Sequence, residues 1–110
     1  MTKVCHLTSV HDRYDVRIFK KECRSLANNG YEVTLLVNDD KDDEVIDNVR
    51  IISTKFIPKN RMDRIIKSGN KLYEKAIQID ADIYHFHDPE LLPIGNKIKR
   101  LGKCVILLPI

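Results

Sequence analysis

Five short apolar runs alternate with longer amphipathic stretches along this 110-residue chain. The runs occupy residues 3–9, 31–37, 49–54, 82–86 and 104–108. Helical periodicity fills the longer stretches, so the order is strand, helix, strand, strand, helix, strand, helix, strand. Strands that alternate with helices form parallel sheets through right-handed crossovers. The pattern therefore predicts an α/β fold, a Rossmann-like doubly wound parallel sheet with strand order 3-2-1-4-5.

Capping residues mark the ends of the predicted helices. Asp15 is a good N-cap for a helix that continues to Ala27, and Gly30 suits the left-handed position after its end. A second helix is predicted over residues 61–79. A third starts near Asp88 and Pro89, which suit a cap and a first turn, and we expect Pro93 to delay or kink it.

An acidic segment separates the second and third predicted strands. Residues 38–48 are predicted to form a solvated loop. Its acidic residues are Asp39, Asp40, Asp42, Asp43, Glu44 and Asp47. A calcium-binding loop would need a glycine for its turn, and this segment has none.

Composition narrows the class of protein. Nineteen basic and 16 acidic side chains leave a net charge of +3, too small a bias to predict a nucleic-acid partner. The three cysteines fall in apolar contexts without C-x-x-C spacing, which indicates reduced thiols in a cytoplasmic protein. No run approaches the roughly 20 apolar residues of a membrane span. We expect one domain over residues 1–110, and a basic side of the second helix leaves peripheral contact with an anionic membrane surface as an alternative.

The predicted strand order brings two polar loops together. The order reverses between the first and fourth strands, so the loop over residues 9–14 should lie beside residues 87–90. Ligands bind at such a switch point in open α/β sheets. His85 and His87 should point to the same side if the fourth strand reaches that far. The predicted substrate-binding residues are His11, Asp12, Arg13, His87, Asp88 and Glu90.

Other chemistries at this place are less well supported by the residues. A metal site would use His85 and His87 with Asp88 and His11, but H-x-H spacing is common and Asp88 suits a helix cap, so no metal site is predicted. The first loop has no glycine and the chain has no Walker A motif, so no dinucleotide or other cofactor is expected. No catalytic residue is assigned. His6 and His85 are interpreted as structural histidines.

Three segments carry a family resemblance. They are residues 6–27 (HLTSVHDRYDVRIFKKECRSLA), 30–35 (GYEVTL) and 80–95 (DADIYHFHDPELLPIG). Together they resemble the start of group 1 glycosyltransferases, family four with the GT-B fold, of bacterial surface polysaccharide synthesis.

The resemblance implies an acceptor-side domain of a retaining glycosyltransferase that uses a nucleotide-sugar donor and requires no metal. The expected acceptor is a sugar or a lipid-linked molecule, with the six predicted site residues facing it. Relatives carry glycines in the first loop and a histidine-containing segment after the fifth strand, where this chain has VILLPI over residues 105–110. The expectation is a single incomplete GT-B N-terminal domain, inactive alone because donor binding needs a C-terminal domain.

A stand-alone module is the alternative. A flavodoxin-like domain could use the same crevice to bind a small phosphorylated or polyol ligand, or to interact with another polypeptide. The last predicted strand, residues 104–108, would be an apolar sheet edge, and such edges pair with other chains. A homodimer through this strand is therefore also expected.

Overall fold

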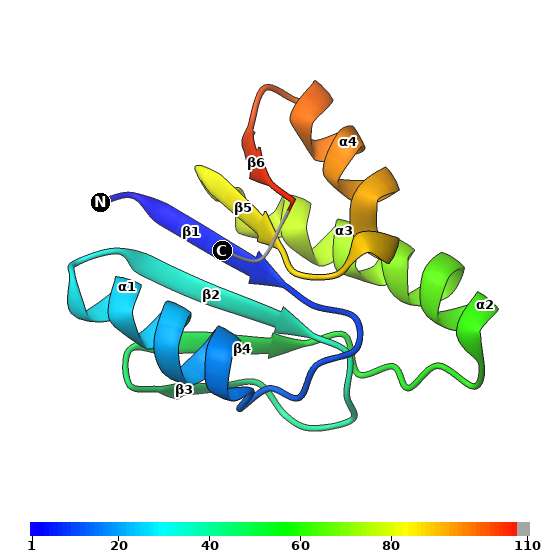
Figure 1. Cartoon of the computed structure of the whole chain (residues 1–110), viewed down its shortest axis with the longest axis horizontal. Coiled ribbons are helices and arrows are strands. Elements are labelled where there is room, and N and C mark those ends of the chain that lie inside the picture. The colour runs from blue at the N-terminus through cyan, green and yellow to red at the C-terminus, as the bar shows by residue number, and fades with distance from the viewer. Residues whose placement is uncertain (108–110) are drawn as a thin grey trace.

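The structure, a computed structural model, describes residues 1–107. In that part of the chain, six strands form one mixed sheet with helices on both faces (Figure 1). The sheet order is β3-β4-β2-β1-β5-β6. The strands are β1 (Lys3–Leu7), β2 (Glu32–Val37), β3 (Glu44–Ile46), β4 (Val49–Ser53), β5 (Ile83–Phe86) and β6 (Cys104–Ile106). The fold class is α/β, and the arrangement is compatible with a Rossmann-like fold.

The observed strand order differs from the predicted 3-2-1-4-5 because the sheet has an additional edge strand. β3 pairs antiparallel with β4, whereas the other neighbouring strands pair in parallel. β3 lies within residues 38–48, so the prediction of a loop there was wrong for this strand. Asp47 and Asn48 have φ of 53° and 63°, which is typical of the type I′ turn of a two-residue hairpin. This turn, rather than any apolar run, directs the three-residue strand back onto β4.

One face of the sheet is covered by the helical segment η1 (Val16–Cys23) and α1 (Arg24–Asn28). The prediction that Asp15 caps this segment is confirmed, since Asp15 Oδ1 accepts a hydrogen bond of 2.9 Å from the Ile18 N–H. Gly30 follows the segment with φ of +90°, a conformation that suits glycine. Buried side chains of the segment meet the strands in one hydrophobic core, formed by Ile18, Phe19, Cys23, Val33, Leu35, Val37, Val49 and Ile51.

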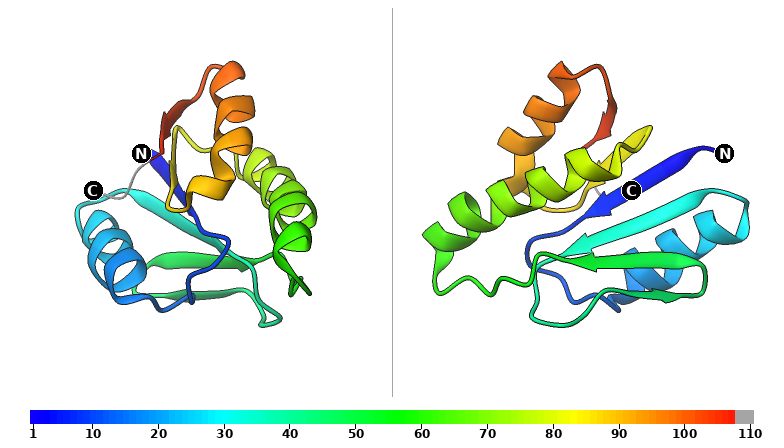
Figure 2. Two further views of the ribbon diagram at one scale, coloured as in Figure 1. Left: turned by 45° about the vertical axis from the view of Figure 1, so that its right-hand side comes forward. Right: turned by 180° about the vertical axis from the view of Figure 1, so that it is seen from behind.

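The opposite face carries two helical segments (Figure 2). The first runs through α2 (Arg61–Asp63), η2 (Arg64–Ser68) and α3 (Gly69–Ile79), and the second through η3 (Pro89–Leu91) and α4 (Leu92–Arg100). Pro93 lies in the first turn of α4, as expected for a delayed start. The second core includes Cys5, Leu7, Leu36, Leu72, Ala76, Ala81, Tyr84, Phe86, Leu91, Ile94 and Ile98.

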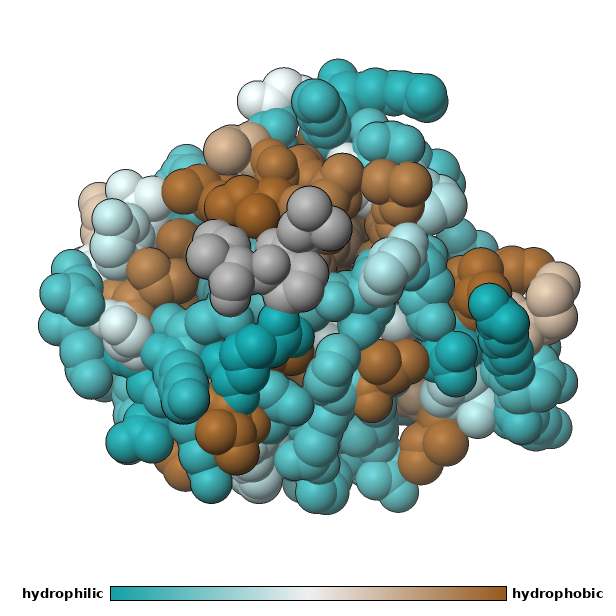
Figure 3. Space-filling view, in the orientation of Figure 1, coloured by the Kyte–Doolittle hydropathy of each residue, from teal (hydrophilic) through white to brown (hydrophobic). Residues whose placement is uncertain are grey.

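β6 forms the other edge of the described sheet and pairs in parallel with β5. The predicted strand extended to Leu108, which lies outside the described residues. Hydrophobic surface gathers around β5 and β6 on the side shown in Figure 3. Among residues 1–107, no helix combines the length and apolar character needed to cross a membrane.

The α3 face should contribute strongly to stability. Leu72 is fully buried, whereas Ile77 on the same helix is 44% exposed. We expect Leu72→Ala to lower the free energy of unfolding by about 2–5 kcal/mol through lost burial and a residual cavity. Ile77→Ala, the matched control, should change it by less than about 0.5 kcal/mol. Urea unfolding followed by circular dichroism measures both values, and similar losses in the two variants would contradict this packing.

Candidate functional site

The carboxyl ends of β1 and β5 bring together two loops that are 80 residues apart in sequence. β1 pairs with β2 on one side and β5 on the other. The pairing continues just past the strands, since the His87 N–H donates to the Leu7 carbonyl at 3.1 Å and the Thr8 N–H donates to the Leu36 carbonyl at 3.1 Å. The polar side chains that follow each strand therefore meet at one edge. Thr8, Ser9, His11, Asp88 and Glu90 are called the switch-point cluster below.

Asp88 is the centre of this cluster. Its Oδ2 accepts hydrogen bonds from the Thr8 hydroxyl at 2.6 Å and from the Ser9 N–H at 2.8 Å. Its Oδ1 lies 3.1 Å from His11 Nδ1. Asp88 occupies the position before η3, but its side chain makes no capping hydrogen bond. The prediction that it caps the helix was wrong, because the loop after β1 supplies better donors than the helix does.

Glu90 extends the cluster toward the helix on the other side. Its carboxylate accepts a hydrogen bond of 2.7 Å from the Ser9 hydroxyl. Arg64 donates from Nε to both Glu90 oxygens, at 3.1 and 2.9 Å. Burial alone would raise the pKa of Glu90, but the hydrogen bonds from Arg64 and Ser9 outweigh it and hold the pKa below its ordinary value. Glu90 is therefore ionised at neutral pH.

His11 and Asp12 lie on the solvent side of the first loop. The His11 ring is 33% exposed and its Nδ1 lies 3.0 Å from the Thr8 hydroxyl. Asp12 is exposed and accepts a hydrogen bond from the Tyr14 N–H at 2.9 Å. Of the six predicted site residues, the structure thus groups His11 with Asp88 and Glu90, and leaves Asp12 beside them as a turn-forming side chain.

Arg13 points into a different network. Its side chain is 1% exposed, and it donates to both carboxylate oxygens of Asp39 at 2.8 and 2.9 Å. It also donates to Glu44 and to the Asp42 carbonyl. Burial would raise the pKa of Asp39, but hydrogen bonds, first that from Arg13, lower it below its ordinary value. Arg13 fastens the acidic segment and β3 to the first loop, a role that sequence reasoning missed.

His87 belongs to a second group, called the histidine cluster below: His6, His85, His87 and Glu22. His85 and His87 lie on the same side, as predicted, with stacked rings whose centroids are 4.2 Å apart. His6 on β1 is the register partner of His85, and its Nδ1 lies 2.8 Å from His87 Nε2. Glu22 lies on η1, the helical segment that covers this face of the sheet, and its Oε1 is 3.8 Å from His85 Nδ1.

Burial keeps two of these rings neutral. Burial, together with the nearby His85, lowers the pKa of His6 to about 3. The pKa of His87 is about 2, again lowered first by burial and then by the neighbouring histidines. Both side chains are neutral at physiological pH, so each has one nitrogen with a lone pair.

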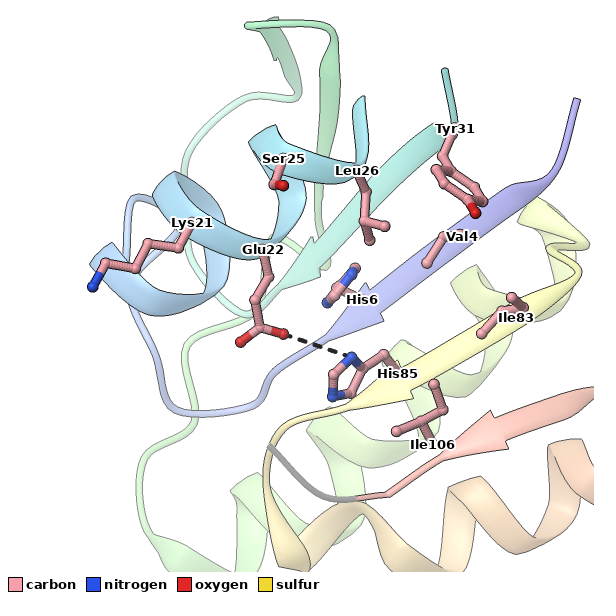
Figure 4. A pocket seen from close by; sticks show the side chains of 10 residues that line it. All are labelled: Val4, His6, Lys21, Glu22, Ser25, Leu26, Tyr31, Ile83, His85 and Ile106. Atoms are coloured by element: carbon pink, nitrogen blue, oxygen red, sulfur yellow. Dashed lines mark ion pairs between the residues drawn. The ribbon is translucent and has the colours of Figure 1, made fainter. Parts of the chain in front are cut away.

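A pocket of about 450 Å³ opens beside the histidine cluster. Figure 4 shows His6, Glu22 and His85 together at one end, with the Glu22–His85 ion pair marked. Val4, Leu26, Tyr31, Ile83 and Ile106 form an apolar part of the lining, and Lys21 and Ser25 of the helical segment complete it. The pocket therefore combines an apolar wall with one polar end.

The four residues considered from the sequence as alternative metal ligands do not lie together in the structure. His11 and Asp88 lie in the switch-point cluster, whereas His85 and His87 are grouped with His6 and Glu22. Sequence reasoning placed His6 in the core and did not consider Glu22. The spacing of His85 and His87 is the only part of the histidine cluster with a sequence signal.

Comparisons with protein-family models, with curated proteins and with solved structures gave no match.

The Arg13 network should make stability depend on acid pH. Because the folded-state pKa of Asp39 lies below its ordinary value, the stabilisation is complete above about pH 4, the usual unfolded-state pKa. It is lost as the pH falls through the folded-state pKa. We expect Arg13→Met to lower the free energy of unfolding at pH 7 by roughly 2 kcal/mol, less than for fully buried pairs because Asp39 is partly exposed. The difference from wild type should shrink at pH 3.

Arg24→Met is the matched control. Arg24 pairs with Asp47 across 3.2 Å with both side chains more than 40% exposed, so its loss should cost less than about 0.5 kcal/mol at either pH. Urea titrations of the three proteins at pH 7 and pH 3 give these values. Equal losses for the two arginine variants, or a loss for Arg13→Met that does not change with pH, would contradict a structural role of the Arg13 network.

Proposed function

We propose that this chain is the acceptor-side domain of a retaining glycosyltransferase that uses a nucleotide-sugar donor in surface polysaccharide synthesis. The observation that carries the proposal is the switch-point cluster, in which Asp88 joins the loops after β1 and β5 at the edge where open α/β sheets bind ligands. Both loops belong to the segments that resemble group 1 glycosyltransferases. The finer description of the fold, a doubly wound N-terminal GT-B domain, is part of this proposal.

The chemistry of the cluster suits a hydroxyl-rich ligand. Sugar hydroxyl groups both donate and accept hydrogen bonds, so they need a mixed set of partners. The partly exposed His11 ring and the Glu90 carboxylate, whose side chain is 18% exposed, offer such a set at the surface of the cluster. Asp88 is already satisfied by Thr8 and Ser9 and therefore serves to hold the two loops in place. In this proposal His11 and Glu90 contact the acceptor and Asp88 positions them.

Carboxylates already occupy the hydrogen-bond donors that a donor diphosphate would need at the same place. A helix N-terminus binds phosphate through free N–H groups. Here the Asp15 carboxylate already occupies the first-turn N–H of Ile18, and Asp88 and Glu90 stand at the start of η3. Arg64 pairs with Glu90, which leaves the Asp88 carboxylate, without a Lys or Arg ion-pair partner among the described residues, to repel a phosphate. The acceptor side is thus the better assignment for these residues, and donor binding would fall to another domain.

Arg13 and His87 have a different part in the proposal. Both are enclosed by protein groups, Arg13 by the acidic segment and His87 by the histidine cluster. We propose that these two buried side chains hold the loops in place and do not contact the ligand. Asp12, which is exposed beside His11, could contact an acceptor that extends past the cluster.

The stand-alone module remains the second candidate, because two hydrophobic cores already cover both faces of the sheet. On this alternative, a polyol would fit the switch-point cluster as well as a sugar acceptor would. A phosphorylated ligand would be disfavoured there for the same reason as the nucleotide-sugar donor. We place either protein in the cytoplasm, since Cys5, Cys23 and Cys104 are free thiols, as expected in a reducing compartment. Peripheral membrane contact and pairing through β6 are further expectations of the proposal.

Ligand titration followed by amide NMR tests the site. We expect methyl glycosides, used as minimal acceptors at millimolar concentration, to shift the amides of Ser9, His11 and Glu90. UDP-glucose should leave these amides unchanged. His11→Gln should weaken glycoside binding about fivefold to tenfold, which corresponds to about 1–1.4 kcal/mol. Glu74→Gln, an exposed carboxylate on α3, is the matched control and should bind as wild type does.

Three outcomes would count against the proposal. Shifts of the switch-point amides by UDP-glucose would assign the donor to this edge. An absence of shifts with every glycoside would remove the acceptor site. Glycosyl transfer from UDP-glucose or another nucleotide-sugar by the purified 110-residue chain would contradict the division of labour between two domains, since we expect no transfer without a donor-binding partner.

A further inference from the structure

The histidine cluster presents four candidate ligand atoms within a small volume. His6, Glu22, His85 and His87 each offer one such atom, and the four atoms lie within 4.8 Å of one another. They come from three elements of the chain: β1, the η1 segment, and β5 with the residue that follows it. Figure 4 shows Glu22 reaching down from the helix toward the ring of His85, with His6 beside it on the neighbouring strand.

Several polar atoms of this cluster are buried without a hydrogen bond. In the described part of the chain, His6 Nε2, Glu22 Oε2 and His87 Nδ1 are inaccessible and have no partner. His6 and His87 are 1% and 3% exposed. A buried polar atom without a partner is destabilising, and native structures contain few such atoms. The cluster therefore contains buried nitrogen and oxygen atoms that the hydrogen bonds among its own members do not satisfy.

The ligand types suit a divalent transition-metal ion. Histidine binds metal through a neutral imidazole, and burial keeps the His6 and His87 rings neutral. Three imidazole nitrogens with one carboxylate oxygen form a nitrogen-rich set of the kind that binds zinc in tetrahedral geometry. A hard cation such as magnesium or calcium prefers oxygen ligands and would fit this set poorly.

We propose that His6, His85, His87 and Glu22 form a binding site for a divalent transition-metal ion, with zinc as the best match to their chemistry. This site is separate from the acceptor contacts of the switch-point cluster. It would fasten the η1 segment to β1 and β5, and it requires no part in glycosyl transfer.

Metal binding requires the side chains of the histidine cluster to rearrange around the ion. Bonds of about 2.0–2.2 Å to a tetrahedral zinc place ligand atoms about 3.3–3.6 Å apart. The separation of 2.8 Å between His6 Nδ1 and His87 Nε2, which share a hydrogen bond, is shorter than this, and that of 3.8 Å between Glu22 Oε1 and His85 Nδ1 is longer. The four ligand atoms spread over up to 4.8 Å, and the rings of His85 and His87 are stacked at 20° to one another, so the rings must rotate about their side-chain torsions before their lone pairs converge on the ion. The ion has a route to the site, because the 450 Å³ pocket is lined by His6, Glu22 and His85.

The rival interpretation is a structural cluster without a metal ion, in which the histidines interact through the His6–His87 hydrogen bond, the Glu22–His85 contact and ring stacking. This interpretation predicts no affinity for metal beyond that of surface groups. The two interpretations therefore differ in stoichiometry, in spectroscopic signature and in their response to substitution.

Titration of the metal-free, tag-free 110-residue chain with zinc and with cobalt decides between them. We expect one equivalent of zinc to bind at micromolar or lower concentration, measured by calorimetry after EDTA treatment and removal of the chelator. Bound zinc should raise Tm by several degrees, because it binds only the folded chain. Cobalt should give the strong visible bands of tetrahedral coordination without a thiolate charge-transfer band, since no cysteine belongs to the site.

Matched variants assign the site to its residues. Glu22→Gln and His87→Gln should each weaken zinc binding about tenfold or more. Glu74→Gln and His11→Gln, the latter at the only histidine outside the cluster, should bind zinc as wild type does. Circular dichroism checks that each variant is folded. Should the His87 variant fail to fold, Glu22→Gln and the cobalt spectrum of the wild-type chain still decide the question.

Three results would overturn the proposal. One is an absence of zinc binding at concentrations up to about 100 μM, far weaker than structural sites show. Another is binding that Glu22→Gln and His87→Gln leave unchanged, which would place the ion on other groups. The third is an octahedral or thiolate-containing cobalt spectrum. Loss of glycoside binding to the switch-point cluster would leave this proposal standing, so the two proposals fail separately.

Discussion

The parallel pairing of β1 with β5 determines where every polar group of interest lies. Val4, Cys5, His6 and Leu7 stand opposite Ile83, Tyr84, His85 and Phe86. This register places His6 against His85 on the face that η1 covers, and it carries Thr8 and Ser9 past the strand end to meet Asp88. A one-residue slip of β5 against β1 would turn the β5 side chains, His85 among them, to the opposite face. The two hydrophobic cores on either side of the sheet therefore also protect the geometry of both polar clusters.

The two clusters resolve the cost of burying polar groups in different ways. Asp88 is 5% exposed, yet it is a well-satisfied carboxylate because an N–H and a hydroxyl of the first loop donate to it. In the histidine cluster, burial lowers the pKa values of His6 and His87, and these two rings stay neutral instead. It still contains buried atoms without hydrogen bonds. A satisfied carboxylate suits a structural clamp between loops, whereas neutral nitrogens with spare lone pairs suit the binding of an additional group.

Local signals predicted the features that depend on neighbours in sequence. Asp15 caps its helix, Gly30 takes a left-handed conformation, and the five apolar runs form strands in the described residues. β3 escaped prediction because its pairing with β4 depends on the turn at Asp47 and Asn48 and not on its own three residues. Asp88 has the sequence context of a helix cap, and only the folded chain shows that Thr8 and Ser9 compete for it. Arg13 looked like a ligand-binding cation because its acidic partners lie at least 26 residues away.

The histidine cluster shows why a site can contain residues that no sequence pattern indicates. Two of its members, His85 and His87, have the two-residue spacing that places side chains on one side of a strand. His6 joins them only through strand register, and Glu22 only through the docking of η1 on the sheet. Each of these placements follows from apolar packing at other positions, such as Ile18, Phe19 and Cys23 on the same helical segment. The hydrophobic core that holds η1 against the sheet is therefore also the physical cause of the approach of Glu22 to the three imidazoles.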